Sequence, residues 1–257
     1  MKSRKKLQGL RVWVTRPEHQ AETLCKLIES NGGNAIRLPL LSIQPPGDPG
    51  AAQTMLAQGA DFDWVIFTSI NAVQQGVALA PESLRWPARR VCIGPGTARA
   101  LAAAGLGQGQ MPEGGGSSSE DMLALPQLQN LRGQRVLIVK GEGGRDVLPR
   151  ALTSRGAQVE QAEVYRRVPA EIKPKQLEAL VTDIDAIIVT SGEALEHLAS
   201  LAAERSALFA AQLVVPSKRV VQMAQDLGFI CTPLIPSHIS DQDIVEALHD
   251  WHAQGAR

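Results

Sequence analysis

The chain has no excess of charge of either sign, because 26 lysine and arginine residues balance 26 aspartate and glutamate residues among its 257 residues. This balance gives no reason to expect binding to nucleic acid or to an anionic membrane surface. Long apolar runs are also missing, since the first apolar stretch, residues 12–14, is far too short for a membrane span or a signal peptide. We therefore expect a cytoplasmic protein, with a solvated basic tail at residues 1–6.

Cysteine is scarce as well: Cys25, Cys92 and Cys231 lie far apart, and no CxxC pair occurs. This usage fits a reducing compartment, so we expect three buried apolar side chains and no disulfide. The five histidines show no metal-ligand spacing; His249 and His252 are three residues apart, but near the end of the chain. The sequence also has no HExxH motif and no Ser-His-Asp pattern, so we expect neither a metal nor a hydrolytic triad.

Short apolar segments rich in β-branched residues alternate with segments of helical periodicity. Residues 18–30 show the helical pattern, with apolar residues on one face and Gly32 and Gly33 at the end. The alternation is typical of parallel strands joined by crossover helices, and it predicts an α/β fold. The expected strands are Arg11–Thr15, Trp64–Thr68, Val91–Ile93, Arg135–Val139, Ala186–Thr190, Leu213–Val215 and Thr232–Ile235.

The order of these segments repeats along the chain. The similar pairs are residues 11–33 with 135–157, residues 63–73 with 185–195, and residues 91–105 with 213–228. The pairs keep their order at a nearly constant offset, which favours an internal duplication over chance similarity between βα units. We therefore predict two similar α/β domains with parallel sheets and flanking helices.

Each copy also has an extended segment that ends in proline, at residues 35–45 and at residues 159–169. We interpret both segments as linkers rather than core strands, which implies that the chain crosses twice between the domains. One domain then comprises residues 1–38 plus 170–257. The other comprises residues 39–169, including the linker strands, with a cleft between the two. A simpler split near residue 130 is the alternative.

Ligands of parallel α/β sheets gather at the carboxyl ends of the strands, so the residues after each strand are the first candidates for binding. Thr15 and Arg16 follow the first strand, and Lys140 and Gly141 occupy the matching place in the second copy. Arginine binds a carboxylate through a two-pronged fork, whereas lysine acts as a point charge. Arg16 and Lys140 are therefore candidates for holding ligand carboxylates, and a solvated loop cation is the alternative for each.

Arg145 stands behind a glycine-rich loop at residues 141–144. No Gly-Lys-Ser/Thr follows, which excludes a P-loop, and Asp146 stands where a dinucleotide fingerprint needs its third glycine. The loop suits carboxylates better, because its backbone N–H groups and Arg145 are all donors. A second glycine-rich segment, residues 114–119, is expected to be a flexible surface loop.

Ser69 and Ser191 follow two further strands and are natural N-caps for the helices after them. A capped helix start still presents N–H groups to an anion, so both serines are also binding candidates. Thr97 stands at another helix start, after Gly94 and Gly96. We expect Thr97 either to cap that helix or to donate a hydrogen bond to a ligand.

Tyr165 is the only tyrosine of the chain, and it lies in the second extended segment. It either packs against a domain or faces the predicted cleft. A phenol has a typical pKa of about 10, so it is a neutral hydrogen-bond donor at neutral pH. Such a group could protonate or polarise a departing oxygen, which makes Tyr165 the candidate catalytic residue.

Taken together, these segments resemble uroporphyrinogen-III synthase, and more closely the bacterial branch of that family. The motifs that carry the resemblance are VTRP (14–17), FTSINAV (67–73), IGPGTARAL (93–101), LIVKGEGGRDVLPRAL (137–152), VYRR (164–167), IIVTSGEAL (187–195) and VPSKRV (215–220). The resemblance covers residues 10 to 250. Two places depart from it: Lys140 replaces a common arginine, and the last motif has no Gly-Thr-Ala, which leaves Ser217 as the candidate there.

The resemblance implies two α/β domains on a two-stranded connection with a mobile cleft. It also implies an enzyme of haem biosynthesis that closes the linear tetrapyrrole hydroxymethylbilane into uroporphyrinogen III, with loss of water, inversion of the last ring and no cofactor. It supports Tyr165 as the general acid. The residues assigned to substrate binding are Thr15, Arg16, Ser69, Thr97, Lys140, Gly141, Arg145, Ser191 and Ser217.

We expect a monomer, and the resemblance allows a transient contact with the preceding enzyme of the pathway. Two other functions fit the same residues. A non-catalytic cytosolic sensor would bind a multi-carboxylate ligand without turnover. A nucleotide-dependent transferase or reductase would use the glycine-rich loop at residues 141–144.

Overall fold

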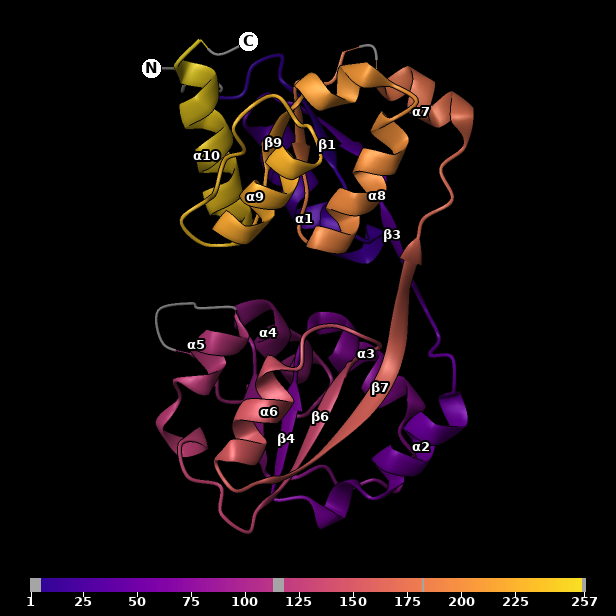
Figure 1. Cartoon of the computed structure of the whole chain (residues 1–257), viewed down its shortest axis with the longest axis vertical. Coiled ribbons are helices and arrows are strands. Elements are labelled where there is room, and N and C mark those ends of the chain that lie inside the picture. The colour runs from indigo at the N-terminus through magenta and orange to yellow at the C-terminus, as the bar shows by residue number, and fades with distance from the viewer. Residues whose placement is uncertain (1–5, 113–117, 182, 256–257) are drawn as a thin grey trace. The chain divides into compact units, whose positions relative to one another are not determined.

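The computed structural model describes residues 6–112, 118–181 and 183–255 of the chain (Figure 1). The predicted basic tail and the predicted loop at residues 114–119 lie for the most part outside these ranges. The chain divides into two compact units: unit 1 consists of Met1–Ser42 and Val168–Arg257, and unit 2 consists of Ile43–Arg167. Each unit has its own sheet and its own hydrophobic core.

Unit 1 is built on a four-stranded sheet with the strand order β2-β1-β8-β9. β1 pairs in parallel with β2 and β8, and β8 pairs in parallel with β9. These strands are β1 (Arg11–Val14), β2 (Asn34–Arg37), β8 (Ala186–Ile188) and β9 (Gln212–Val214). The helices are α1 (Glu18–Ser30), α7 (Pro174–Val181), α8 (Gly192–Ala202), η4 (Ser206–Ala210), α9 (Lys218–Asp226) and α10 (Asp241–Ala253).

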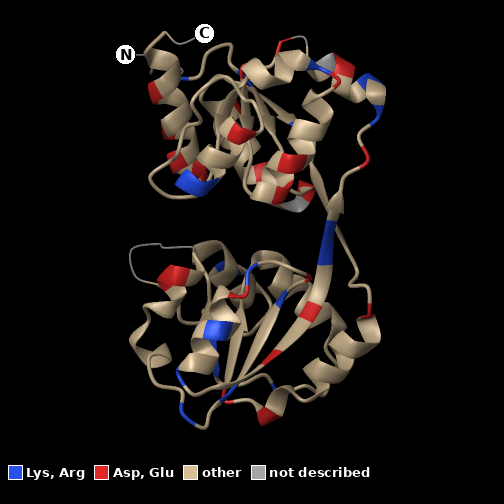
Figure 2. Cartoon of the chain, in the orientation of Figure 1, with Lys and Arg blue, Asp and Glu red and all other residues tan. Residues whose placement is uncertain are grey.

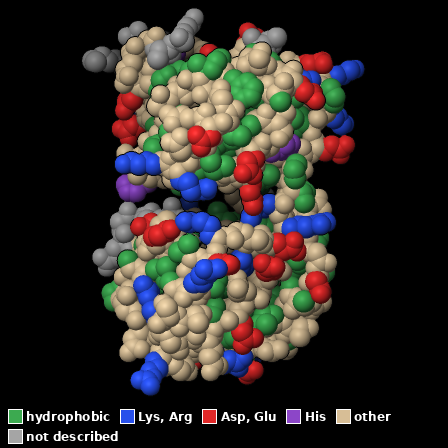
Figure 3. Space-filling model, viewed as in Figure 1, with side chains coloured by type: hydrophobic (Ala, Val, Ile, Leu, Met, Phe, Trp, Pro, Cys, Tyr) green, Lys and Arg blue, Asp and Glu red, His purple; other side chains and the backbone are tan. Residues whose placement is uncertain are grey.

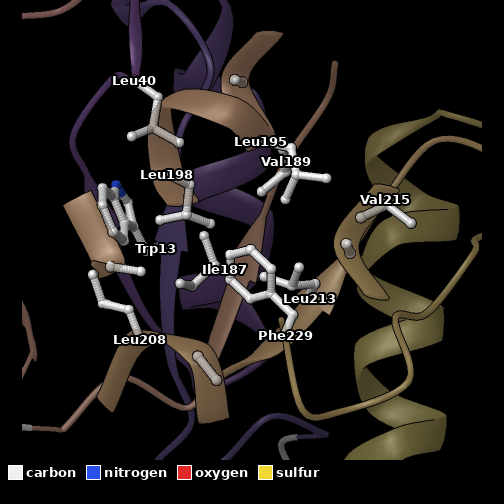
Figure 4. Packing of buried hydrophobic residues seen from close by; sticks show 14 of the residues in the cluster. Trp13, Leu40, Ile187, Val189, Leu195, Leu198, Leu208, Leu213, Val215 and Phe229 are labelled. Carbon is white, nitrogen blue, oxygen red and sulfur yellow. The ribbon is translucent and has the colours of Figure 1, made fainter. Parts of the chain in front are cut away.

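Side chains alternate between the two faces of the unit 1 sheet, because successive residues of a strand point in opposite directions. Trp13 of β1 packs into one core with Leu198 of α8 (Figure 4). Its neighbour Val14 packs into a second core with Leu24 of α1 and Leu248 of α10. Helices therefore cover both faces of this sheet, which explains why residues 12–14 of β1 and all of β8 are apolar without alternation.

Unit 2 is built on a five-stranded sheet with the strand order β3-β7-β6-β4-β5. β4 pairs in parallel with β5 and β6, and β6 pairs in parallel with β7. The strands are β3 (Leu41–Gln44), β4 (Trp64–Phe67), β5 (Arg89–Cys92), β6 (Arg135–Gly141) and β7 (Gln158–Pro169). The helices are α2 (Pro49–Ala57), η1 (Gly59–Asp61), α3 (Ile70–Leu79), α4 (Pro95–Ala103), α5 (Ser119–Leu123), η3 (Pro126–Leu128) and α6 (Val147–Ser154).

The unit 2 sheet is also buried on both faces. Phe67 of β4 lies in a core with Leu101 of α4. Its neighbour Ile66 lies in a core on the other face, with Met122 of α5 and Leu152 of α6. The α/β class with parallel sheets and flanking helices is therefore confirmed, and each sheet is held by apolar burial on two sides.

Two predictions about strands are wrong. The segments at residues 35–45 and 159–169 are strands as well as connections: they contain β3 and most of β2 and β7, and β7 pairs with β6 from Arg135 to Gly141. The boundaries between the two units, Ser42/Ile43 and Arg167/Val168, lie within these same two segments. Residues 232–235 do not form a strand, and only Leu234 makes an isolated bridge, to Val214. The reason is that Pro233 has no N–H to donate to a ladder.

Cys25 and Cys92 are buried, as predicted, but Cys231 is partly exposed, which corrects the expectation of three buried thiols. Burial raises the pKa of the Cys92 thiol to about 11, so Cys92 is protonated and unreactive near neutral pH. Among the described residues, no helix is long and apolar enough to cross a membrane.

Candidate functional site

Each sheet collects candidate residues at the carboxyl ends of its parallel strands. In unit 1 the chain leaves β1 for β2 on one side and later places β8 on the other, so a topological switch point lies between β1 and β8. In unit 2 the corresponding point lies between β4 and β6. Ligands of open α/β sheets bind at such points, and the residues that follow these four strands are therefore the ones to examine.

In unit 1, Thr15 and Arg16 follow β1 beside this point. The Thr15 side chain is only 3% exposed, and its hydroxyl donates to the Ile188 carbonyl at 2.6 Å. This bond uses the single hydroxyl proton to hold β1 against β8. Arg16 lies 2.5 Å from the carboxylate of Asp241, the first residue of α10. The structure thus places Thr15 in a structural contact and Arg16 in an ion pair.

Two serines begin helices at the same edge of unit 1. Ser191 is the N-cap of α8, and its hydroxyl accepts a hydrogen bond from the Ala194 N–H at 3.2 Å, as predicted. Ser217 occupies the N-cap position of α9, but within the described chain its side chain makes no capping bond. The Ser217 hydroxyl is therefore not committed to its helix, unlike the hydroxyl of Ser191.

In unit 2, Ser69 and Tyr165 are brought together from distant parts of the sequence. Ser69 follows β4 and caps α3, accepting from the Ala72 N–H at 3.0 Å. The Ser69 and Tyr165 hydroxyl oxygens are 3.0 Å apart. The Tyr165 ring is 3% exposed and belongs to a buried apolar cluster, so the packing alternative holds for the ring, while its hydroxyl takes part in a polar contact.

Gly141 allows this contact across the sheet. β6 lies between β7, which carries Tyr165, and β4, which precedes Ser69. A Cβ atom at Gly141 would lie 2.6 Å from Cζ of Tyr165 and 2.7 Å from Nη1 of Arg167. The ring therefore occupies the space that a side chain on β6 would need. Gly141 serves the approach of Tyr165, whereas the sequence suggested a backbone donor for a ligand.

The two candidate cations of unit 2, Lys140 and Arg145, each have an acidic partner. Lys140 is 3.5 Å from Glu163, and Arg145 forms a forked contact with Glu120, at 2.8 and 3.3 Å. The Arg145 guanidinium beside it is the main reason that the pKa of Glu120 is lowered. Figure 3 shows basic and acidic side chains interspersed on the face in view. A ligand carboxylate at these cations would have to displace a protein carboxylate.

Thr97 is the third residue of α4 and is 3% exposed. Gly94 is the N-cap of this helix, so the alternative that Thr97 caps it is wrong. In the glycine-rich loop after β6, Gly143 and Gly144 have φ values of +67° and +88°. Residues other than glycine rarely adopt this conformation, which explains why glycines stand there.

The sequence reasoning missed Arg167 as a separate site residue. Its Nη1 donates to the Tyr165 hydroxyl oxygen at 3.1 Å, and its Nη2 donates to the Glu142 carbonyl at 3.3 Å. The sequence feature that could have pointed to Arg167 is its position two residues after Tyr165 on the same strand, since residues two apart share a side of a strand. Among the described residues, no group of three histidine, cysteine, aspartate or glutamate side chains is placed to hold a metal ion.

These observations define a class: an α/β protein with two compact units, each presenting hydroxyl groups and at least one ion-paired cation after the strands of a parallel sheet. The family model described as uroporphyrinogen-III synthase HemD matches residues 22–246 of the chain. The chain therefore belongs to the uroporphyrinogen-III synthase family.

Individual relatives agree with this assignment. Uroporphyrinogen-III synthase of Escherichia coli (strain K12) is 32% identical over 227 residues, which cover 85% of this chain and 92% of that protein. A crystal structure of mutant uroporphyrinogen III synthase from the extremely thermophilic bacterium Thermus thermophilus superposes with a TM-score of 0.60 at 19% identity, over 96% of this chain and 100% of that one. The crystal structure of uroporphyrinogen-III synthetase from Helicobacter pylori 26695 also superposes with a TM-score of 0.60, at 15% identity, over 97% of this chain and 100% of that one. At these identities the two structures support the fold.

Proposed function

We propose that this chain is a uroporphyrinogen-III synthase, a cyclising hydro-lyase of tetrapyrrole biosynthesis that converts hydroxymethylbilane into uroporphyrinogen III. The observation that carries this function is the similarity to the Escherichia coli enzyme over 92% of that protein's length. The match of residues 22–246 to the family model supports the same function.

The reaction explains the kind of site that the chain needs. Loss of the terminal hydroxyl leaves an azafulvene cation, which an electron-rich pyrrole attacks. Closure without an enzyme yields the uninverted isomer, so the enzyme must direct attack to the substituted carbon of the last ring, through a spiro intermediate. This is a task of holding the substrate in one geometry, for which binding residues contribute more than a strong acid or base.

Tyr165 is the proposed general acid for the departing hydroxyl. A phenol is a stronger acid than the serine and threonine hydroxyls of the candidate set, and it is neutral near pH 7. Its position is fixed, because the buried ring cannot turn away. Ser69 lies 3.0 Å from its oxygen and keeps the hydroxyl oriented. General acids of this kind contribute through a proton that is already aligned with the leaving oxygen.

Arg16, Lys140 and Arg145 are the proposed partners of substrate carboxylates. Each has a carboxylate partner in the protein, so binding exchanges one ion pair for another and adds only modest affinity per cation. A substrate with several carboxylates makes several such exchanges at once, so their modest contributions to affinity add up. The hydroxyl and backbone groups proposed to complete binding are Thr15, Ser69, Thr97, Gly141, Ser191 and Ser217.

The duplication is supported by the strand order. If β1 corresponds to β6, β2 to β7, β8 to β4 and β9 to β5, then β2-β1-β8-β9 matches β7-β6-β4-β5 strand for strand. Each unit would then combine the first half of one copy with the second half of the other. We propose that β3 and β7, in which the chain passes between the units, form the two-stranded connection of the domains.

We further propose that the enzyme acts as a monomer in the cytoplasm and contacts the preceding enzyme of the pathway only transiently. Free Cys25, Cys92 and Cys231 support a reducing compartment.

An isomer assay tests the proposed function. Hydroxymethylbilane is generated freshly and incubated with the protein, and the oxidised products are separated into uroporphyrin I and uroporphyrin III by chromatography. We expect isomer III to predominate over a protein-free control. Isomer I alone, from a protein shown to be folded, would contradict the proposal and favour a non-catalytic sensor of the same ligand.

A further inference from the structure

Arg167 and Tyr165 are two residues apart on β7 and lie on the same side of the strand, and an irregularity in the pairing turns the Tyr165 ring toward the core. The pairing with β6 shifts between Lys140 and Gly141, so that Gly141 is opposite Tyr165. This shift brings the Tyr165 ring into the core next to Val164, where strict alternation would turn it away. Arg167, two residues further on, then points to the same side as Tyr165.

The Arg167 guanidinium is held by two acceptors at once. Nη1 donates to the phenol oxygen at 3.1 Å, Nη2 donates to the Glu142 carbonyl at 3.3 Å, and the guanidinium carbon lies 5.6 Å from the centre of the Tyr165 ring. Glu142 is itself tied to β7, since its N–H donates to the Tyr165 carbonyl at 2.7 Å. The rigid fork of an arginine suits this double contact, which a lysine cannot reproduce.

The direction of these hydrogen bonds decides where the phenol proton can go. Arginine has donors only, so the Tyr165 oxygen must accept from Arg167. Either hydroxyl can be the donor in the contact between Ser69 and Tyr165, and Ser69, which accepts from the Ala72 N–H, still has its own proton to donate. When Ser69 donates, the phenol oxygen accepts from both Arg167 and Ser69, and the single phenol proton is available for a substrate.

We propose that Arg167 is a positioning residue for the general acid, which aligns the Tyr165 proton and stabilises the negative charge left on its oxygen. This inference rests on the proposed function. In the step, the phenol proton passes to the hydroxyl oxygen of hydroxymethylbilane as the C–O bond breaks. The electron pair of the C–O bond stays with that oxygen, which leaves as water. The substrate becomes the azafulvene cation and Tyr165 a phenolate beside the Arg167 cation. The proton released when the new ring regains its aromatic form restores the phenol.

Arg166 offers a matched control. It neighbours Arg167 on β7, a strand on which Figure 2 shows basic residues, and its side chain is exposed. Because successive residues of a strand point in opposite directions, Arg166 is expected on the side of β7 away from Tyr165. Arg166→Gln and Arg167→Gln therefore remove the same charge from the same strand, and only the second removes a donor from Tyr165. Arg167→Lys keeps the charge and loses the fork.

The experiment compares steady-state kinetics of these variants on freshly generated hydroxymethylbilane, in the parent chain and in a Tyr165→Phe background. We expect Arg167→Gln to lower kcat by about tenfold and to leave KM unchanged. The same substitution should have no further effect in the Tyr165→Phe background, because the group through which Arg167 acts is then absent. Arg167→Lys should recover part of kcat, and Arg166→Gln should match the parent.

Three results would overturn the inference: a higher KM at unchanged kcat, which indicates direct carboxylate binding; an equal loss of kcat in both backgrounds; or no loss at all. Thermal unfolding of every variant identifies any that misfold. If Arg167→Gln misfolds, Arg167→Lys is compared with the parent in its place. A parent chain that forms only isomer I would refute the proposed function itself. A parent that forms isomer III with an unaffected Arg167→Gln variant would refute only the role of Arg167.

Discussion

The contact between Gly141 and Tyr165 can be tested by adding one methyl group. In a Gly141→Ala variant, the new Cβ would lie 2.6 Å from Cζ and 2.7 Å from Cε2 of the Tyr165 ring, and 2.7 Å from Nη1 of Arg167. Carbon atoms without a bond between them do not approach this closely, so the ring or strand β6 must move. The ring is 3% exposed and has little room to do so.

The cost follows from this overlap. Overpacking a buried site by one methyl group costs roughly 1–3 kcal/mol, and each kcal/mol lowers Tm by about 2–4 °C in a chain of this size. A shift of the ring also separates its hydroxyl from Ser69 and Arg167. Because a misplacement of about 1 Å can cost about a hundredfold in rate, we expect kcat to fall by roughly 10–100-fold, as for removal of the hydroxyl.

Gly143→Ala provides the matched control. Gly143 has a φ of +67°, so alanine there is strained, by roughly 1–2 kcal/mol. An added Cβ at Gly143 meets no atom within 4 Å, so it leaves Tyr165 in place. Circular dichroism melts and the isomer assay, run on both variants, should show similar losses of stability but a loss of kcat only for Gly141→Ala. Equal kcat values for the two variants would refute the reasoning.

The remaining predictions concern single groups of the site. Tyr165→Phe should slow turnover by about 10–100-fold with folding retained, and an unchanged kcat would exclude Tyr165 as the acid. Lys140→Ala should raise KM modestly with little change in kcat, and a KM equal to the parent's would remove it from the binding set. Ser191→Ala should lower the free energy of unfolding by about 1 kcal/mol through loss of the α8 cap, measured by urea titration; full stability would contradict the cap. The pKa of Glu120, followed by NMR, should lie below its ordinary value of 4.5 because Arg145 donates to it. The stabilisation from this pair should be complete above pH 4.5 and be lost as the pH falls through the lower folded-state pKa, and Arg145→Gln should raise that pKa.

Local patterns in the sequence predicted much of the fold correctly. The apolar segment at Trp64–Phe67 is a strand, and Ser69 and Ser191 cap the helices that follow their strands. These features depend on residues within one turn or one strand of each other, so a short window of sequence contains the physical cause. The family assignment is confirmed for the same reason, since it rests on motifs whose order and spacing can be read directly from the chain.

The errors arose where pairing partners are distant. Residues 159–169 look like a linker because they hold β-branched residues and end in Pro169. The chain does pass between the units in this segment, but backbone pairing with β6 also makes it a strand. Residues 232–235 looked like a strand from their apolar side chains, but Pro233 limits pairing to one bridge at Leu234. Backbone pairing depends on which neighbour is available, and that neighbour lies outside any local window.

The sequence by itself determined the α/β class, the parallel strands, the helix caps and the family, because each follows from local periodicity or from ordered motifs. Only the tertiary structure decided the chemistry of the individual groups. It placed the Tyr165 hydroxyl between Ser69 and Arg167, across a strand that has Gly141 at the crossing point. It also gave the candidate cations carboxylate partners from elsewhere in the chain. Such contacts arise from the register of strands and the packing of helices. These bring together residues that are far apart in the sequence and that no sequence pattern links.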